Sequence, residues 1–425
     1  MEPFHLRYGE GEVVCDMTGA RSITTLQPQP LPPMVDVKAA FLAAMAEDCV
    51  DSPPLRALLT PGDLVTIILS DITRFWMRQD VICKLLVDYL HDVVGVPDEN
   101  MVLLVALGTH RPQTEAECQR LVTPEIYARI RVVNHDAEAP DLQYVGTTTY
   151  GTRVCVHPLA VGRKVILIGG TVHHLMAGFG GGRKSILPGV SAKETINQNH
   201  LHALSPDAPC SNPRIGLGVL AGNPLHADMV EAAAFVHPLF GINIVADDHS
   251  RLCGLFCGHW LHAWEKSCAQ VQAAFGVPID APADLVVASC GGYPKDINLY
   301  QATKSLLNAA RAVRPGGTLL FLARCKEGGG APAFFSWITS LQRGTLDADL
   351  RADFSIAGYI FYAACEAIAR ATVYMLTDIP ADTVRPMGLH AASSLDVLLP
   401  RIDFTGKRVY VMEAAGSVVP MASND

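Results

Sequence analysis

The sequence predicts an α/β protein with mostly parallel sheets, because short apolar segments alternate with amphipathic helical patterns along the chain. Runs rich in Val, Ile and Leu occupy residues 63–71, 101–110, 164–170, 241–248, 283–292 and 317–324. Their length and composition are typical of strands buried on both faces. Strands separated by helical segments favour parallel pairing, with the helices covering the faces of the sheet.

Helices are expected where apolar residues recur three and four positions apart. Residues 78–93 and 297–313 show this spacing, and residues 259–274 form another long helical segment. The apolar stretch 354–371 contains Glu366 and Arg370. It is too short and too charged to span a bilayer, which needs about 20 apolar residues. We therefore expect a buried helix there.

Two domains are expected, with a boundary at residues 275–284. This segment contains prolines, follows a long helical pattern and precedes a new apolar strand. We assign residues 1–275 to an N-terminal domain and residues 283–407 to a C-terminal Rossmann-like α/β domain. Residues 408–425 form a tail strand whose sheet the sequence does not identify. An active-site cleft is expected between the two domains.

Composition and charge exclude several classes of protein. The 425 residues are 49% hydrophobic and 18% charged, which is typical of a globular chain. A net charge of −9, without a basic block, argues against nucleic acid or a membrane as a partner. The twelve cysteines include no C-x-x-C pair and are expected to be reduced. The N-terminus lacks a signal-peptide pattern, so we expect a cytoplasmic protein.

Polar side chains follow the first three predicted strands, at the edge where open α/β sheets bind ligands. They are Asp71, Thr73, Arg74, His110, Arg111 and His174. Two histidines that face one substrate suit a reaction needing both a base and an acid. Arginine binds a carboxylate or phosphate bidentately, although Arg74 could instead form an ion pair with Asp71. A catalytic role is less expected for His173 than for His174, because only one of two neighbouring side chains need point into the cleft.

Two further groups stand out. Tyr300, Gln301 and Lys304 share one face of a predicted helix, where they could reach a cleft or form a solvated face. His200 or His202 could bind a metal, because imidazole suits Ni, Cu, Zn and Fe.

The segment GFGGGRKSILPG at residues 178–189 resembles a phosphate-binding loop but departs from it. A Walker A loop has glycine before its Lys-Ser or Lys-Thr pair, whereas Arg183 precedes Lys184 and Ser185 here. A phosphate- or nucleotide-binding, kinase-like protein is therefore a distant alternative.

Six motifs in a fixed order provide a stronger indication. They are SDITR, ALGTHR, HLMAGFGGGRKSILPG, NQNH, GNPLHADMVEAA and GGYPKDINLYQATKSL. Together they resemble the lactate racemase family over residues 60–310, and LRYGEGEV at residues 6–13 is similar to the family's opening hairpin. The resemblance implies two α/β domains, with residues 1–275 as the cofactor-binding catalytic domain.

The resemblance also implies a cofactor. The family uses a nickel-pincer nucleotide, a pyridinium-3,5-bisthiocarboxylic acid mononucleotide that carries Ni. By motif, Lys184 would be joined to it as a thioamide, and His200 would be the protein ligand of the nickel. Gly180, Gly181, Gly182, Arg183 and Ser185 would surround the cofactor and its phosphate. Enzymes that make the cofactor would be partners, and protein purified without them would be the apoprotein.

The family mechanism gives the remaining candidates their roles. His110 and His174 match the two catalytic bases, which exchange protons with a 2-hydroxy acid while its C2 hydride moves to the cofactor and a 2-keto acid forms. Arg74 and Lys304 match carboxylate-binding positions, and Tyr300 and Gln301 lie near the substrate. Asp71 would orient a histidine or the arginine. The implied activity is that of a racemase or epimerase.

The chain departs from the family at positions that predict a substrate other than lactate. Phe75 and Trp76 follow Arg74, where the family has proline, and Tyr359, Ile360 and Phe361 replace polar residues. A larger or more apolar 2-hydroxy acid is the predicted substrate. A 2-hydroxyacid oxidoreductase or lyase with the same cofactor is the alternative, and a non-enzymatic binding module fits the polar residues least well.

Overall fold

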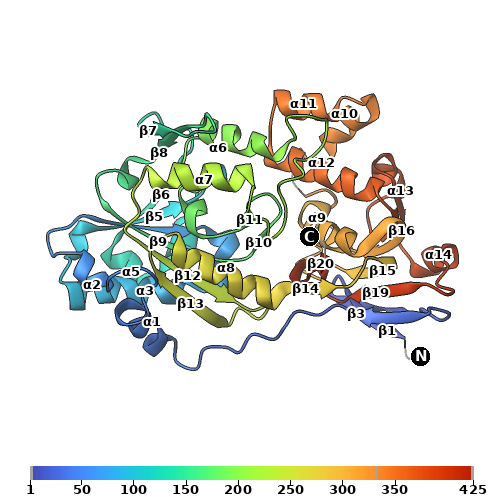
Figure 1. The fold of residues 1–425 in the computed structure, drawn as a ribbon, viewed down its shortest axis with the longest axis horizontal. Coiled ribbons are helices and arrows are strands. Elements are labelled where there is room, and N and C mark those ends of the chain that lie inside the picture. The colour runs from blue at the N-terminus through green and yellow to red at the C-terminus, as the bar shows by residue number, and fades with distance from the viewer. Residues whose placement is uncertain (1–2, 331–332, 423–425) are drawn as a thin grey trace. The chain divides into compact units, whose positions relative to one another are not determined.

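The computed structural model describes residues 3–330 and 333–422, which form two compact units (Figure 1). Unit 2 comprises residues 30–203 and 212–272. Unit 1 comprises the chain up to residue 29, residues 204–211 and the chain from residue 273 onward. No helix among the described residues is both long and apolar enough to cross a membrane.

Unit 2 is built on a six-stranded sheet. Its strands, in spatial order, are β13 (Leu252–Gly258), β12 (Phe240–Ala246), β9 (Lys164–Gly170), β4 (Val65–Ser70), β5 (Met101–Ala106) and β6 (Arg131–Asn134). Every neighbouring pair is parallel except β12 and β13. Four of these strands coincide with predicted apolar runs, and the predicted α/β class with mostly parallel sheets is confirmed.

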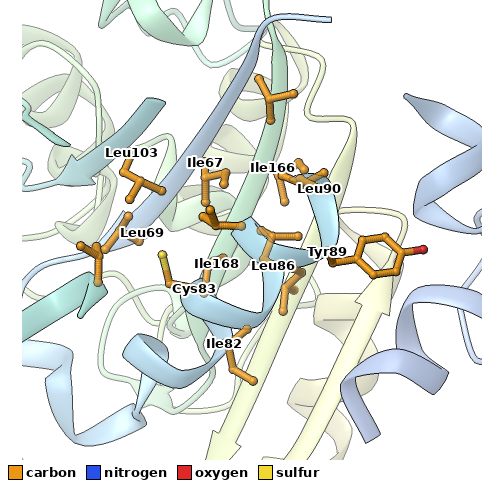
Figure 2. Close-up of a cluster of buried hydrophobic side chains, with 14 of the residues drawn as sticks. Ile67, Leu69, Ile82, Cys83, Leu86, Tyr89, Leu90, Leu103, Ile166 and Ile168 are labelled. Carbon is orange, nitrogen blue, oxygen red and sulfur yellow. The ribbon is translucent and has the colours of Figure 1, made fainter. Parts of the chain in front are cut away.

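A hydrophobic core fixes helix α3 (Gln79–Tyr89) to this sheet (Figure 2). Ile82, Cys83 and Leu86 lie on one face of the helix and are fully buried. They meet Ile67 of β4 and Ile168 of β9, which are also fully buried. Burying a side chain of this size contributes about 1.5–3 kcal/mol. The helical spacing predicted for residues 78–93 therefore matches the face that the core uses.

The remaining elements of unit 2 connect and cover the strands. The helices are α1 (Val37–Ala46), α2 (Leu55–Leu58), α4 (Glu115–Val122), α5 (Pro124–Arg129), α6 (Lys193–His200), α7 (Pro224–Ala234) and α8 (His262–Phe275), which crosses into unit 1. The short strands are β7 (Gln143–Thr147), β8 (Arg153–Val156), β10 (His173–His174) and β11 (Gly178–Phe179). Two 3-10 turns, η1 (Ile72–Met77) and η5 (Gly182–Ser185), carry candidate site residues.

Unit 1 has its own six-stranded parallel sheet. Its order is β18 (Leu389–Ala392), β17 (Thr372–Leu376), β16 (Val313–Leu322), β15 (Ala283–Ser289), β19 (Arg408–Met412) and β3 (Ser22–Thr25). The hairpin of β1 (Phe4–Tyr8) and β2 (Gly11–Cys15) packs on its core, and β14 (Gly276–Ile279) pairs with β20 (Val419–Ala422). The helices are α9 (Leu299–Ala312), α10 (Ile338–Arg343), α11 (Leu346–Ala352), α12 (Ile356–Ala369), α13 (Ala381–Val384) and α14 (Leu395–Leu398).

The division of the chain differs from the sequence prediction at both ends and at residues 204–211, which belong to unit 1 and not to the first domain. Residues up to 29 were assigned to the first domain, but they belong to unit 1 because β3 pairs with β19. The predicted tail strand is β19, which lies between β15 and β3. Helix α12 is largely buried, as expected for residues 354–371. All twelve cysteines lie in the described residues as free thiols.

Candidate active site

The candidate catalytic residues of unit 2 follow three adjacent strands. Asp71 follows β4, His110 follows β5 and His174 follows β9, and β4 pairs with both of the other strands. The chain runs from β4 to β5 on one side and returns to β9 on the other, so the strand order reverses at β4. Ligands of open α/β sheets bind outside the carboxyl ends of the strands at such a point.

Asp71 links the start of η1 to His110. Its Oδ1 accepts hydrogen bonds from the backbone N–H of Thr73 at 3.1 Å and from the Thr73 hydroxyl at 2.5 Å. Its Oδ2 pairs with Nδ1 of His110. Burial alone would raise the pKa of Asp71, but the hydrogen bonds from His110 and Thr73 outweigh it and the pKa is lowered. The carboxylate is therefore ionised and holds the proton of His110 on Nδ1, leaving the lone pair on Nε2.

The two arginines near this edge behave differently. Arg111 forms a bidentate pair with Glu117, at 2.8 and 2.6 Å, and is committed to that surface ion pair. Arg74 makes no ion pair within 4 Å in the described part of the chain, and its guanidinium donates to the Thr73 hydroxyl at 3.2 Å. The predicted alternative of an Arg74–Asp71 ion pair is not formed. Arg74 therefore keeps donors for an anion.

His174 contacts the lysine of the glycine loop. Its Nδ1 accepts the backbone N–H groups of Met176 and Ala177, at 3.3 and 3.2 Å. In the neutral ring the proton therefore lies on Nε2, which is 3.2 Å from Nζ of Lys184. An N–H can donate only to a lone pair, and an ammonium group has none. The contact thus fits a neutral amine on Lys184.

The charges around Lys184 and His174 also favour the neutral forms of both groups. The pKa of Lys184 is lowered to about 7, most of all by burial, then by the charge of Arg183 and then by that of Arg74. Burial also lowers the pKa of His174 well below its usual value, with Lys184 and His200 adding to the effect. A neutral amine is a nucleophile, whereas an ammonium is not.

His200 ends helix α6 and is 1% exposed. Its Nδ1 donates to the carbonyl of Ile196, one turn earlier, at 2.9 Å. Burial and, to a smaller extent, the charge of Lys184 lower its pKa to about 3, so the ring is neutral with its lone pair on Nε2. Such a histidine can serve as a metal ligand. In residues 3–330 and 333–422 no group of three or more His, Cys, Asp or Glu could hold a metal ion.

The glycines of the loop are required by packing inside unit 2. Gly181 and Gly182 have φ values of +73° and +53°, which side chains other than glycine rarely adopt. A Cβ on Gly182 would lie 2.5 Å from Trp264, and one on Gly181 would lie 2.8 Å from the carbonyl oxygen of Gly170. Gly180 has more space, with 3.5 Å to its nearest neighbour, Val172. The loop is therefore pressed against β9 and the indole ring.

The remaining predicted residues fall in two places. Ser185 is buried beside Gly169 in unit 2, and the Arg183 guanidinium is enclosed beneath the loop. Tyr300, Gln301 and Lys304 lie on α9 of unit 1, where Lys304 donates to Gln301 at 3.4 Å. His173 pairs with Gln272 at 2.9 Å, as expected for a structural histidine.

Sequence reasoning missed a buried polar network behind His200. Asp228 of α7 is fully buried and accepts hydrogen bonds from Thr148, Thr152 and Asn199 at 2.6, 2.7 and 2.8 Å. His202 lies 3.7 Å from the same carboxylate. The network ties the last turn of α6 to α7 and to the β7–β8 hairpin. An aspartate on the apolar helix of the motif GNPLHADMVEAA was the available signal.

Comparison with known proteins places this arrangement in a family. The lactate racemase N-terminal domain matches residues 8–211, and the lactate racemase C-terminal domain matches residues 279–404. A lactate racemase of Thermoanaerobacterium thermosaccharolyticum is 30% identical over 342 residues, covering 79% of this chain and 78% of that protein. A lactate racemase of Lactiplantibacillus plantarum is 32% identical over 289 residues, covering 67% and 66%.

Two solved structures are similar to this chain in fold. The lactate racemase apoprotein from T. thermosaccharolyticum superimposes with a TM-score of 0.86 at 26% identity, covering 99% of this chain and 100% of that one. A Thermotoga maritima protein shares the fold, with a TM-score of 0.62 at 19% identity and coverage of 84% and 93%. The matched domains and the lactate racemase relatives identify the chain as an isomerase of the racemase class. The chain belongs to the lactate racemase family.

Proposed function

We propose that this enzyme racemises or epimerises a 2-hydroxy acid through a 2-keto acid, with a nickel-pincer nucleotide bound covalently to Lys184. The observation that carries the proposal, in a chain of this family, is the contact of Lys184 with His174. The charge of Arg74 acts on both of these groups and on Asp71, which pairs with His110. When bound, the cofactor would supply a hydride acceptor, so that both faces of the substrate C2 can be reached through one planar intermediate.

The residues present fit that cofactor. Because the pKa of Lys184 is lowered to about 7, a large fraction of its amine is neutral at pH 7, as formation of a thioamide bond requires. His200 offers a neutral imidazole whose Nδ1 is held by Ile196, as is usual for a metal-ligating histidine. One histidine suits a metal whose other donors come from the cofactor itself. Imidazole is a suitable ligand for Ni(II).

His110 and His174 are not equivalent. Asp71 holds a proton on Nδ1 of His110, so its Nε2 is ready to accept the substrate hydroxyl proton. Nδ1 of His174 accepts two backbone N–H groups, so its neutral ring presents an N–H on Nε2. His174 could donate a hydrogen bond to the substrate oxygen at once. To act as a base at Nε2 it must first give up those two backbone contacts.

Substrate selection would depend on Arg74, Lys304 and Trp76. Arg74 keeps donors for the carboxylate, and the role proposed for Lys304 in carboxylate binding rests on its position in the family motif alone. Trp76 is 37% exposed on η1, two residues after Arg74. Phe75, in contrast, packs against the Arg120 guanidinium at 4.2 Å. Trp76 is therefore the departure best placed to favour a larger or more apolar acid than lactate.

Tyr359, Ile360 and Phe361 provide weaker support than Trp76 for a larger substrate. All three are buried on α12, with exposures of 2%, 4% and 0%. Tyr359 donates to the Ser211 hydroxyl and Phe361 packs edge-on against Phe334, both within unit 1. Their apolar character is accounted for by packing inside this unit.

Intact-protein mass spectrometry tests the cofactor. Protein coexpressed with the cofactor-making enzymes is expected to carry a covalent adduct that Lys184→Ala removes. Nickel content is expected to fall in His200→Ala. Lys193→Ala, which removes an exposed lysine of α6, is the matched control and should keep the adduct. Fully active protein with an unmodified Lys184 would refute the assignment.

Optical rotation tests the reaction. A single enantiomer of each acid in a panel from lactate to bulkier aryl and branched 2-hydroxy acids is incubated with loaded enzyme. Rotation that decays to zero indicates racemisation, whereas net formation of a keto acid or loss of a leaving group indicates the oxidoreductase or lyase alternative. Lactate turnover above that of every bulkier acid would contradict the substrate proposal.

A further inference from the structure

Arg183 is a charged side chain enclosed in unit 2 without a counter-ion. It is 0% exposed, and within the described residues it forms no ion pair within 4 Å. Burial lowers its pKa to about 9, which leaves it protonated at neutral pH. Burying a charge of this kind costs free energy, and the cost is reduced when every hydrogen-bond donor of the group is satisfied.

The donors of Arg183 are satisfied by the glycine loop itself. Nη2 donates to the Ala177 carbonyl at 2.6 Å, and Nη1 donates to those of Phe179 and Gly181 at 2.8 and 3.4 Å. Nε donates to Nδ1 of His226 at 3.2 Å. Three carbonyls within five residues therefore converge on one guanidinium, which sets the path of the backbone from 177 to 181.

Trp264 closes the other side of this arrangement. The guanidinium carbon of Arg183 lies 3.9 Å from the centroid of the Trp264 ring, in a cation–π contact. The indole N–H donates to the Gly180 carbonyl at 2.8 Å, and His226 stacks near the same ring at 5.6 Å. Arginine, indole and loop backbone thus form one interlocked group, hereafter the Arg183–Trp264 clamp.

We propose that Arg183 is a positioning residue for Lys184: the Arg183–Trp264 clamp sets the loop that carries the lysine and places an unneutralised positive charge beside the lysine amine. The inference rests on the proposed function, in which Lys184 reacts as a nucleophile. The proposal assigns Arg183 a role in positioning Lys184 within the protein, whereas its place in the motif suggested direct contact with the cofactor. The charge favours the amine over the ammonium, and the clamp limits where the amine can lie.

The surroundings of Lys184 leave little to oppose this effect. Among the residues that the structure describes, His174 on β10 contacts the Lys184 amine. Arg183 on η5, Arg74 on η1 and His200 on α6 interact with it electrostatically. None is a carboxylate. Burial contributes most to the low pKa of Lys184, with Arg183 next and Arg74 third, so removing the Arg183 charge should raise that pKa by part of the total shift.

The test uses cofactor-free full-length protein and acetic anhydride, so it needs neither nickel nor a substrate. The neutral amine forms a C–N bond as the C–O bond to the departing acetate breaks, and the amine proton passes to water. Acetylation of Lys184 is measured by peptide mass spectrometry from pH 5.5 to 9.5, with exposed Lys266 as the internal reference. The wild-type midpoint is expected near 7.

Arg183→Met is expected to raise this midpoint by about 0.5–1 pH unit, which lowers Lys184 labelling at pH 7 roughly two- to fivefold. Arg163→Met is the matched control. Arg163 also donates to backbone carbonyls, those of Val65 and Asn100 at 3.0 and 2.9 Å, but it lies at the amino end of the sheet. It should lose comparable stability and leave the Lys184 midpoint unchanged.

An unchanged midpoint in folded Arg183→Met protein would overturn the proposal. If that variant does not fold, Arg183→Lys replaces it, because it keeps the charge and loses the fork of donors. Its midpoint should stay near the wild-type value, and a rise as large as that expected for Arg183→Met would overturn the role of the charge. A normal Lys184 profile together with a missing cofactor adduct would instead count against the proposed function alone.

Discussion

Asp71→Asn is expected to disable the enzyme by reversing the tautomer of His110. In the wild type, Oδ1 of Asp71 accepts from both the backbone N–H and the hydroxyl of Thr73, at 3.1 and 2.5 Å. The asparagine must keep its carbonyl oxygen at that position, because turning the amide would set its NH₂ against the Thr73 N–H. The NH₂ group then faces Nδ1 of His110.

The magnitude follows from that geometry. Facing a donor, Nδ1 of His110 must accept, and the ring proton moves to Nε2, the atom that should receive the substrate proton. A catalytic histidine held in the wrong tautomer loses on the order of 10⁴ in turnover. We expect kcat to fall by about 10³–10⁴-fold with little change in stability, because the amide is isosteric and its hydrogen bonds are kept.

Two assays check this expectation. Turnover of the best acid in the panel is compared for Asp71→Asn, His110→Gln and the double variant. Because the two residues act as one unit, the double variant should be no slower than the slower single variant. Ring ¹⁵N shifts of His110 should change from an Nδ1–H to an Nε2–H pattern. Wild-type turnover in Asp71→Asn, or an Nε2–H pattern already in the wild type, would refute the reasoning.

Three stability predictions follow from the same structure. Gly182→Ala should lower the free energy of unfolding, measured with urea, by about 2–5 kcal/mol, because the substitution places a Cβ at a left-handed φ and 2.5 Å from Trp264. Gly180→Ala, the control, should lower it by less than about 1 kcal/mol. Leu86→Ala should cost about 2–5 kcal/mol, since Leu86 is fully buried against the sheet; a loss below 1 kcal/mol would contradict the core in Figure 2. Burial lowers the pKa of His135 to about 4, and its Nδ1 has no partner, so the unfolded chain binds the proton more strongly. The contribution of His135 to stability is complete above pH 6.5 and is lost as the pH falls towards 4. His135→Gln should therefore reduce the difference in unfolding free energy between pH 7 and pH 4.5 by about 2–3 kcal/mol. An unchanged difference would contradict the lowered pKa of His135.

The sequence by itself determined the fold class and the chemistry available at the strand ends. Buried parallel strands must be apolar on both faces, so β4, β5, β9 and β12 are visible as continuous runs of Val, Ile and Leu. Asp71 follows β4 directly, and His110 and His174 lie four residues after the ends of β5 and β9. Loops after buried strands have no packing reason to carry such residues, which is why they stood out.

Only the tertiary structure decided how those residues are connected. The contacts of Asp71 with His110 and of Lys184 with His174 join residues 39 and 10 positions apart, and no local pattern reports on them. The same holds for β3, which pairs with β19 across nearly the whole chain and moves the first residues into unit 1.

Arg183 shows the difference most clearly. In the sequence it is a basic residue beside a lysine in a glycine loop, which suggests a ligand-binding side chain. In the structure it is fully buried, because three loop carbonyls and the Trp264 ring, 81 residues later, supply the partners that allow a guanidinium to leave water. Side-chain direction depends on which distant residues complete the environment, and that information is held by the folded chain as a whole.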